Sequence, residues 1–177
     1  MAKIVFVDKN DRPIGAGSKK EAFEKGIPHR VVRVFLFNSK GEFLLQKRSQ
    51  WVDAPLTWDQ SVGGHVDEGE GYEQAAYREL EEELGIKSVP LKEVVRYYHE
   101  QTSIKGQPVI PSCKRFNAIF TGTCDGPFTT SEREISEVHW VALPELDVWI
   151  ARSREDFSEG FLYAYGKFKE ANKGAEN

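Results

Sequence analysis

The sequence predicts a fold of the α/β class in its α+β form, a mixed β-sheet with helices packed on its faces. Runs rich in Val, Ile, Phe and Tyr recur along the chain and are typical of strands. Segments with a helical hydrophobic period lie between and after them, without strict alternation. The 177 residues, 40% hydrophobic and 29% charged, suit one globular domain, and we expect residues 1–177 to form it.

The first elements form an N-terminal extension, residues 1–28, made of a hairpin and a helix. Residues 3–15 predict two short strands, because apolar runs flank a polar turn. Residues 18–26 predict a two-turn helix, with Ser18 as its N-cap and Gly26 as its stop.

The central elements are mostly strands. Residues 30–38 and 42–49 are rich in branched and aromatic side chains and are joined by "SKG", which predicts a β-hairpin. A loop with a short strand is expected over residues 51–63. Further strands are expected at residues 94–101, 113–122 and 137–143.

Two helices are expected near the C-terminus, over residues 143–153 and 155–171. The second carries three aromatic residues at helical spacing, Phe161, Tyr165 and Phe168. The tail, residues 168–177, is expected to fray.

Negative charge is concentrated in residues 64–86, "GHVDEGEGYEQAAYRELEEELGI". The stretch holds eight Asp or Glu residues and one Arg, so the rest of the chain has a net charge of +3, although the whole chain has −4. This near-neutral remainder offers no basic footprint for a nucleic-acid polymer. A positively charged ligand is therefore expected at the stretch itself.

The later part of the stretch, residues 71–84, predicts a helix with two distinct faces. The buried stripe is expected to comprise Tyr77, Leu80 and Leu84. The other face carries three carboxylates, Glu79, Glu82 and Glu83. Ala75 and Ala76 lie beside that face and are expected to leave open space in front of it.

The acidic face is unfavourable for an isolated helix. Like charges at these spacings cost about 0.2–0.5 kcal/mol per pair. They also lie near the helix C-terminus, where the dipole favours cations by about 0.3–1 kcal/mol. Arg78 can pair with Glu82, but it is one charge among several acids. Because Mg²⁺ is commonly held by carboxylates, we interpret the face as a metal site in preference to a solvated surface.

The stretch also matches the pattern G-x5-E-x7-R-E-U-x-E-E-x-G-U, where U is aliphatic, at all nine defined positions. These positions are Gly64, Glu70, Arg78, Glu79, Leu80, Glu82, Glu83, Gly85 and Ile86. A chance match anywhere in the chain has a probability on the order of 10⁻⁷. The pattern is the Nudix box, and the chain resembles the Nudix hydrolase superfamily.

The resemblance implies an α/β/α sandwich and a Mg²⁺-dependent hydrolase, with Mn²⁺ as a substitute metal. Its substrate would be a small-molecule diphosphate, such as a nucleoside diphosphate linked to another moiety. The implied metal ligands are Glu79, Glu82, Glu83 and the carbonyl of Gly63. Arg78 would orient Glu82, and Glu70 would brace the loop of the box.

Two residues outside the box resemble further family positions. Glu134 lies before a strand with a Trp near its end and is favoured over Glu132 and Glu137 as a later carboxylate, with an ordinary charged loop as the alternative. Arg48 resembles an Arg that family members place near the phosphates, with a solvated strand end as the alternative. The general base is either Glu79 or Glu134.

A narrower resemblance, over most of residues 4–141, is to isopentenyl-diphosphate isomerase. It rests on "VDKNDRPIG", "HRVVRVFLFN", "FLLQKRS" and "WDQSVGGH". The isomerase's catalytic Cys would fall at Gly63 and its catalytic Glu near Arg115, so both groups needed for proton transfer at carbon are lost. His29 and His65 match two metal-binding His of the isomerase but lack the acidic partners, so they are interpreted as structural or substrate-facing. Hydrolysis is favoured over isomerisation and over a non-catalytic binding module.

The remaining features concern compartment and substrate. Cys113 and Cys124 suit neither a disulfide framework nor a metal-binding spacing, which favours a reducing cytoplasm. The first apolar run is too short for a signal peptide, and no run is long enough to cross a membrane. A homodimer is the common default. Aromatic residues that could stack on a nucleobase are Trp51, Trp58, Tyr97 and Phe128.

Overall fold

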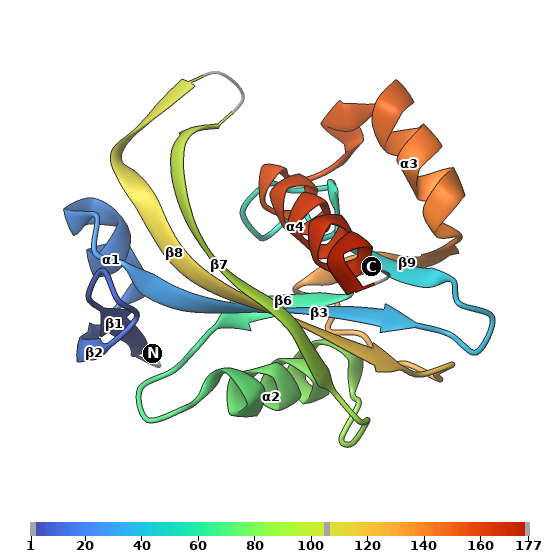
Figure 1. Cartoon of the computed structure of the whole chain (residues 1–177), viewed down its shortest axis with the longest axis horizontal. Coiled ribbons are helices and arrows are strands. Elements are labelled where there is room, and N and C mark those ends of the chain that lie inside the picture. The colour runs from blue at the N-terminus through green and yellow to red at the C-terminus, as the bar shows by residue number, and fades with distance from the viewer. Residues whose placement is uncertain (1–2, 105–106, 176–177) are drawn as a thin grey trace.

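The computed structural model describes residues 3–104 and 107–175. Its strands form one mixed nine-stranded sheet. In Figure 1, helix α2 (Tyr72–Leu84) lies on one face of the sheet, and helices α3 (Leu143–Arg152) and α4 (Glu159–Ala175) lie on the other. This arrangement confirms the predicted α+β mixed sheet and its three layers.

The N-terminal elements have the predicted order. Strand β1 (Ile4–Val7) pairs antiparallel with β2 (Pro13–Gly17), and helix α1 (Lys19–Lys25) follows. The side chain of Ser18 accepts a hydrogen bond in the first turn of α1, and Gly26 ends the helix at a φ of 61°. The local sequence signals therefore correspond to real caps.

Strand β3 (His29–Phe37) is the centre of the sheet. It pairs in parallel with β8 (Gln107–Thr123) along its whole length. Its other edge is shared in turn by β1, by β6 (Val62–His65) and by β4 (Phe43–Arg48). The strand is thus buried on both edges and both faces, which explains its nearly continuous apolar sequence.

The predicted hairpin between residues 30–38 and 42–49 is confirmed at its turn, where β3 and β4 pair antiparallel. Strands β3 and β4 pair only at Phe37 and Phe43, next to their turn. The rest of that edge of β3 is occupied by β6, so β4 diverges. It pairs instead with β9 (Ile135–Val141) and with β5 (Trp58–Asp59).

Side chains of β3 alternate between two apolar clusters on opposite faces of the sheet. Val32, Val34 and Leu36 pack in the cluster that contains the buried residues of α2. Phe35 packs in the cluster that contains Phe161 and the other buried aromatics of α4. The two-residue period of the strand therefore supplies both layers with core side chains.

Strands β7 (Lys92–Ile104) and β8 form a long antiparallel pair that arches away from the body of the sheet at the upper left of Figure 1. Both extend beyond the predicted ranges 94–101 and 113–122. The arch stands beside the N-terminal extension and forms one wall of the cleft described below.

The C-terminal end differs from the prediction of a frayed tail. After α3, a short 3₁₀ turn (Arg154–Asp156) leads into α4, which continues through Ala175. Phe168 is buried against Phe35. This aromatic contact explains why the helix persists beyond residue 168, where the sequence turns polar.

Within the described residues, none of the helices combines the length and the apolar character that crossing a bilayer requires.

Candidate functional site

Helix α2 presses its predicted acidic face against the sheet. Glu79 and Glu83 are only 8% and 2% exposed, on the same side as the fully buried Ala75 and Ala76. Ala75 and Ala76 pack inside the apolar cluster of this face of the sheet, and the open space expected in front of the acidic face is present as a cleft that Glu79, Glu82 and Glu83 line. Two of the three carboxylates are therefore buried, whereas the side chain of Glu82 is 56% exposed.

Gly64 permits this close approach of helix and strand. A Cβ atom placed on Gly64 would lie 1.9 Å from the Oε1 atom of Glu79. A side chain at this position would displace the carboxylate of Glu79, so the first glycine of the box permits the observed position of Glu79. At its other end the helix stops at Gly85, which has a φ of 69°.

Arg78 ties the acidic helix to the preceding loop. Its guanidinium donates to both carboxylate oxygens of Glu70, at 2.9 and 3.0 Å, and to the carbonyl of His65 at 2.8 Å. It also donates to Glu79 at 2.8 Å and to Glu82 at 3.2 Å. Burial disfavours the charge of Arg78, but the hydrogen bonds and charges of Glu70 and Glu79 outweigh this effect and raise its pKa. The predicted contact with Glu82 is present, and the shorter one is to Glu79.

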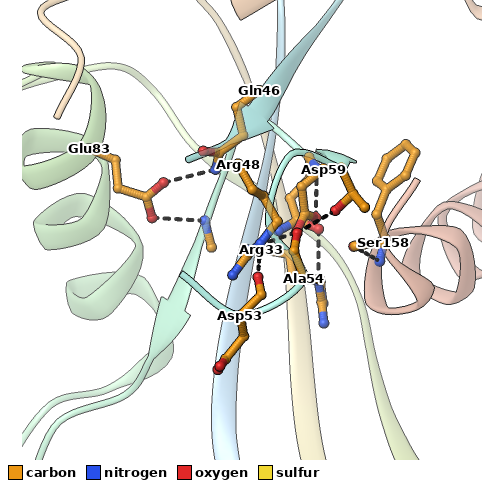
Figure 2. A network of polar contacts seen from close by, with 12 residues as sticks. Arg33, Gln46, Arg48, Asp53, Ala54, Asp59, Glu83 and Ser158 are labelled. Atoms are coloured by element: carbon orange, nitrogen blue, oxygen red, sulfur yellow. Dashed lines mark hydrogen bonds and ion pairs between the residues drawn. The ribbon is translucent and has the colours of Figure 1, made fainter. Parts of the chain in front are cut away.

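Glu83 is a buried carboxylate with neutral partners only. Figure 2 shows Glu83 facing Gln46, whose amide donates to one carboxylate oxygen at 2.9 Å. The backbone N–H of Gly63 donates to the other oxygen at 3.3 Å. In the described part of the chain no Lys, Arg or His forms an ion pair with it. A buried carboxylate without a counter-charge is costly, so this position favours a bound cation.

The surroundings of the two buried carboxylates favour their protonated forms. Burial raises the pKa of Glu79 to about 7, against the opposing effect of Arg78. Burial, and then the charge of Glu79, raise the pKa of Glu83 well above its usual range. The charge of Glu134 acts in the same direction on both groups. The three carboxylates thus repel one another across one space, which suits hard cations that prefer oxygen ligands.

These side chains surround a cleft of about 1600 Å³. Seven predicted site residues line it: Gly63, Arg48, Arg78, Glu79, Glu82, Glu83 and Glu134. The eighth, Glu70, lies behind Arg78 and reaches the site only through it. Of the alternatives to Glu134, Glu137 pairs with Lys47 at 3.9 Å, and neither it nor Glu132 lines the cleft.

The predicted metal ligands share the cleft but do not converge. Over residues 3–104 and 107–175, no three His, Cys, Asp or Glu side chains are arranged to enclose a metal ion. Glu79 and Glu82 instead face Arg78. The ligand set therefore stays a prediction, which the donor chemistry and the burial of Glu83 fit.

Arg48 is held at the cleft by two acceptors. Figure 2 shows it beside Asp53 and Asp59, where its Nε donates to the carbonyl of Asp53 at 2.6 Å and its Nη1 to the carboxylate of Asp59 at 3.0 Å. Asp59 is buried, so this ion pair fixes the direction of the arginine. Arg48 is therefore a positioned cation and not a solvated strand end.

Several cleft residues were missed by the sequence analysis. Gln46, Asp59, Gln60 and Arg33 are all buried and hydrogen-bonded around the cleft. The available signal was a polar residue inside an otherwise apolar strand, as in "RVVRVFLF" and "FLLQKR". Such residues are seldom buried unless they have partners, and these partners come from other parts of the chain.

His29 and His65 stack on each other, with ring centroids 5.2 Å apart. The Nδ1 atom of His29 lies 3.1 Å from the carbonyl of Ile27, and neither Nε2 atom has a hydrogen-bond partner in the described structure. Burial lowers the pKa of His29 to about 4 and that of His65 well below its usual value. The pair is therefore neutral, and Phe23 packs against both rings.

Only one of the four candidate stacking aromatics lines the cleft. Trp51 does, and it is 73% exposed. Trp58 is buried edge-on against Trp149, and Phe128 packs on Trp140. Tyr97 packs on Tyr163. Trp58 therefore belongs to the core, and Tyr97 and Phe128 are partly buried against it.

Comparisons with known proteins agree with this geometry. The family model described as NUDIX domain matches residues 27–161, which leaves most of the N-terminal extension outside it. An uncharacterised Nudix hydrolase of Pseudomonas aeruginosa is 37% identical over 151 residues, covering 85% of this chain and 83% of that protein. Isopentenyl-diphosphate Delta-isomerase 2 of Photorhabdus laumondii is 35% identical over 161 residues, covering 89% of this chain and 87% of that protein.

Solved structures show the same fold. A crystal structure of a Deinococcus radiodurans protein has a TM-score of 0.68 and 25% sequence identity, covering 85% of this chain and 89% of that one. The family model matches most of the chain, and the glutamates of the complete box line the cleft. This chain therefore belongs to the Nudix hydrolase family.

Proposed function

We propose that this protein is a Mg²⁺-dependent hydrolase of the phosphoanhydride bond in a nucleoside diphosphate linked to another moiety, or in a related organic diphosphate. The observation that carries the proposal is Glu83, a carboxylate buried at the cleft without a cationic partner. Glu79 and Glu134 add negative charge to the same space. A divalent cation would neutralise this cluster, and a diphosphate would complete the coordination of that cation.

The metal would be held by carboxylate oxygens of Glu79, Glu82 and Glu83, with the carbonyl of Gly63 as a further ligand. When bound, a divalent cation neutralises phosphate oxygens and activates water for attack on phosphorus. Glu79 and Glu82 would have to turn toward the ion from their contacts with Arg78. Mn²⁺ would serve in place of Mg²⁺, because both prefer oxygen ligands.

The other residues position the ligands and the substrate. Arg78 holds Glu79 and Glu82 against the loop through Glu70, so it keeps the acidic face oriented. Arg48 presents a fixed guanidinium for a phosphate oxygen, because Asp59 and the carbonyl of Asp53 constrain it. Trp51 is the exposed aromatic on which a nucleobase could stack. Glu79 and Glu134 both remain candidates for the general base.

The test is a hydrolysis screen over nucleoside diphosphate and triphosphate derivatives and isoprenoid diphosphates, with Mg²⁺ and with products identified by mass. Glu83→Gln should lower kcat by a factor on the order of 10² or more, because it removes the buried ligand charge. Glu81→Gln is the matched control, since Glu81 is exposed on the same helix and does not line the cleft. Hydrolysis that survives Glu83→Gln unchanged would refute the assignment of the metal site.

A second candidate is isomerisation of isopentenyl diphosphate, which is favoured by the similarity to proteins named as that isomerase. Against it, Gly63 stands where the isomerase has its Cys, and a Cβ there would lie 2.6 Å from the amide of Gln60. Arg115 stands near the place of the catalytic Glu. Proton transfer at a double bond needs both groups, so their replacement argues against isomerisation.

The double variant Gly63→Cys with Arg115→Glu tests this argument. It should not isomerise isopentenyl diphosphate efficiently, because Gln60 obstructs the new side chain and the pocket does not place both groups at one double bond. Product analysis with isopentenyl diphosphate, on the wild type and on the double variant, checks it. Isomerisation by the wild type would establish the second candidate. Nucleotide binding with neither reaction would establish a non-catalytic module.

A further inference from the structure

Six cationic side chains line the cleft, and four of them have carboxylate partners. The pairs are Lys19 with Asp53, Arg48 with Asp59, Arg78 with Glu70, and Arg154 with Glu159. The other two cations are Arg33 and Arg115. Neither forms an ion pair with a carboxylate in the described part of the chain.

Arg33 is a buried guanidinium with neutral partners. It is 6% exposed, its Nη1 donates to the Oε1 atom of Gln60 at 2.7 Å, and its Nε donates to the Oδ1 atom of Asn117 at 3.2 Å. These amides satisfy hydrogen bonds but not the charge. Burying a charge is costly unless an opposite charge is supplied.

The start of α4 does not supply that opposite charge. A Cβ atom on Gly160 would lie 3.1 Å from the Nη2 atom of Arg33, so the first turn of the helix stands directly against the guanidinium. A helix N-terminus has a partial positive charge, which adds to that of Arg33. Glu159 in the same turn is paired with Arg154.

Arg115 lies on the same face of the sheet as Arg33. Strands β3 and β8 pair in parallel, with His29 beside Arg115 and Val31 beside Asn117, and Asn117 is the residue that Arg33 contacts. Arg115 is half-buried, with its guanidinium 5.9 Å from the centre of the Phe23 ring. Burial, and then the charges of Arg115 and Arg33, lower the pKa of His99 to about 4. Both arginines therefore lie near His99, which itself lies outside the lining of the cleft.

The cleft consequently holds groups of both charges. Glu79, Glu83 and Glu134 line it, and so do Arg33, which lies on β3 beside Gly63, and Arg115, which lies on β8 beside His29. Its volume of about 1600 Å³ exceeds the roughly 300–1,000 Å³ of a typical small-molecule pocket. A ligand that fills the cleft would contact both the carboxylates and the two arginines.

We propose that Arg33 and Arg115 form a second anion subsite, which binds a phosphate monoester on the part of the substrate beyond its diphosphate. This inference rests on the proposed function, in which the diphosphate binds at the carboxylates. A phosphate monoester carries about −1.5 to −2 charges at pH 7, which balances two guanidinium groups better than one carboxylate would. Guanidinium groups also match the geometry of phosphate oxygens with paired N–H donors.

The first test measures phosphate binding without hydrolysis. Thermal unfolding is followed in EDTA, with 50 mM inorganic phosphate or with chloride at equal ionic strength. Phosphate should raise the Tm of the wild type and should leave that of Arg115→Gln at its chloride value. Arg154→Gln removes the same charge from a paired cleft arginine and should respond like the wild type. Arg33→Gln is a further variant, and Arg115→Gln decides the result if the loss of the buried Arg33 prevents folding.

The second test compares substrates that differ by one phosphate monoester, with Mg²⁺ present. The pairs are coenzyme A with dephospho-coenzyme A, and NADPH with NADH. Within a pair that is cleaved, the wild type should show a KM at least tenfold lower for the compound that carries the phosphate monoester. Arg115→Gln should abolish this preference. Its kcat for the compound without the monoester should stay unchanged.

The outcomes separate the two proposals. If the protein cleaves diphosphates but phosphate does not raise its Tm, the anion subsite is overturned and the proposed function stands. The same conclusion follows if phosphate raises the Tm of the wild type and of Arg115→Gln equally. Phosphate binding that depends on Arg115, without hydrolysis of any diphosphate, would support the subsite and overturn the proposed function.

Discussion

At the scale of single residues, the three glutamates of the box differ in environment although they share a motif. Glu83 is buried and accepts only from an amide and a backbone N–H. Glu79 is buried but faces Arg78, and Glu82 is exposed at the rim. Replacement of each residue should therefore affect stability differently, even before a metal is added.

Glu83→Gln is expected to stabilise the metal-free protein. Because burial raises the pKa of Glu83 in the folded state, the folded protein disfavours its ionised form, and the cost grows as pH rises through that pKa. In EDTA at pH 8 the free energy of unfolding should increase by about 0.5–1 kcal/mol. The substitution removes the repulsion between Glu83 and the neighbouring carboxylates and its unfavourable interaction with the C-terminal end of the helix dipole. Urea unfolding at pH 5 and pH 8 measures it, with a larger gain at pH 8.

The exposed Glu82 supplies the comparison. Glu82→Gln should change the free energy of unfolding by less than about 0.5 kcal/mol, as is usual at an exposed position. The Glu82 and Glu83 substitutions should therefore differ in effect. Equal effects, or a loss of stability in Glu83→Gln at both pH values, would contradict the conclusion that the buried carboxylate of Glu83 lowers the stability.

His29 predicts a pH dependence of opposite sign. Its folded-state pKa of about 4 lies below the ordinary value of 6.5, so the unfolded chain binds a proton first as the pH falls. The contribution of His29 to the free energy of unfolding is complete above about pH 6.5. It falls by roughly 3 kcal/mol as the pH is lowered to about 4. His29→Gln should flatten that part of the profile of unfolding free energy against pH. An unchanged slope would show that His29 is protonated in the folded protein.

At the scale of secondary-structure elements, the site depends on the contact between α2 and β6. The helix brings Glu79 and Glu83 under the strand, and the strand contributes Gly63 and Gly64. The pairing of β6 with β3 holds this strand in place. The carboxylates are consequently positioned by two rigid elements and not by a loop.

Gly64→Ala should disrupt this contact. The added Cβ would overlap the carboxylate of Glu79, so the helix or the side chain must move, at a cost of about 1–3 kcal/mol. Gly166→Ala is the matched control, because Gly166 lies inside α4 and a methyl group added there would meet no atom within 4 Å. It should stabilise the protein by about 0.5–1 kcal/mol. Chemical unfolding of both variants tests the pair, and an unaffected Gly64→Ala would refute the packing argument.

At the scale of the whole molecule, the cleft combines residues from nearly every layer. The carboxylates Glu79, Glu82, Glu83 and Glu134 come from α2 and the loop before β9. The arginines that line the cleft come from β3, β4, α2, β8 and the 3₁₀ turn, and the start of α4 adds to its lining. A ligand bound there contacts elements that are distant in the sequence. Its binding energy should therefore stabilise the complete fold.

Mg²⁺ should raise the free energy of unfolding of the wild type by about 2.7 kcal/mol at a hundredfold excess over its Kd. For a chain of this size that corresponds to roughly 5–10 °C in Tm. Glu83→Gln should lose most of this response, and Glu81→Gln should retain it. Thermal unfolding in EDTA and in millimolar Mg²⁺ checks the prediction. Equal responses in the wild type, Glu79→Gln and Glu83→Gln would show that the metal binds elsewhere.

The sequence by itself determined the features that depend on local chemistry. The caps at Ser18, Gly26 and Gly85 follow from hydrogen bonding and backbone freedom within one turn, so they were predictable. The strand and helix types follow from hydrophobic period, and the family follows from the box. None of these features requires knowledge of which strands become neighbours.

Only the tertiary structure decided pairing and burial. The hairpin between β3 and β4 pairs only next to its turn, because β6 occupies more of that edge of β3, and α4 continues past residue 168 because Phe168 contacts Phe35. The same long-range packing buries Glu79 and Glu83, exposes Glu82 and leaves Arg33 without a carboxylate. Each outcome depends on contacts between residues far apart in the chain, whose energies a local pattern does not contain.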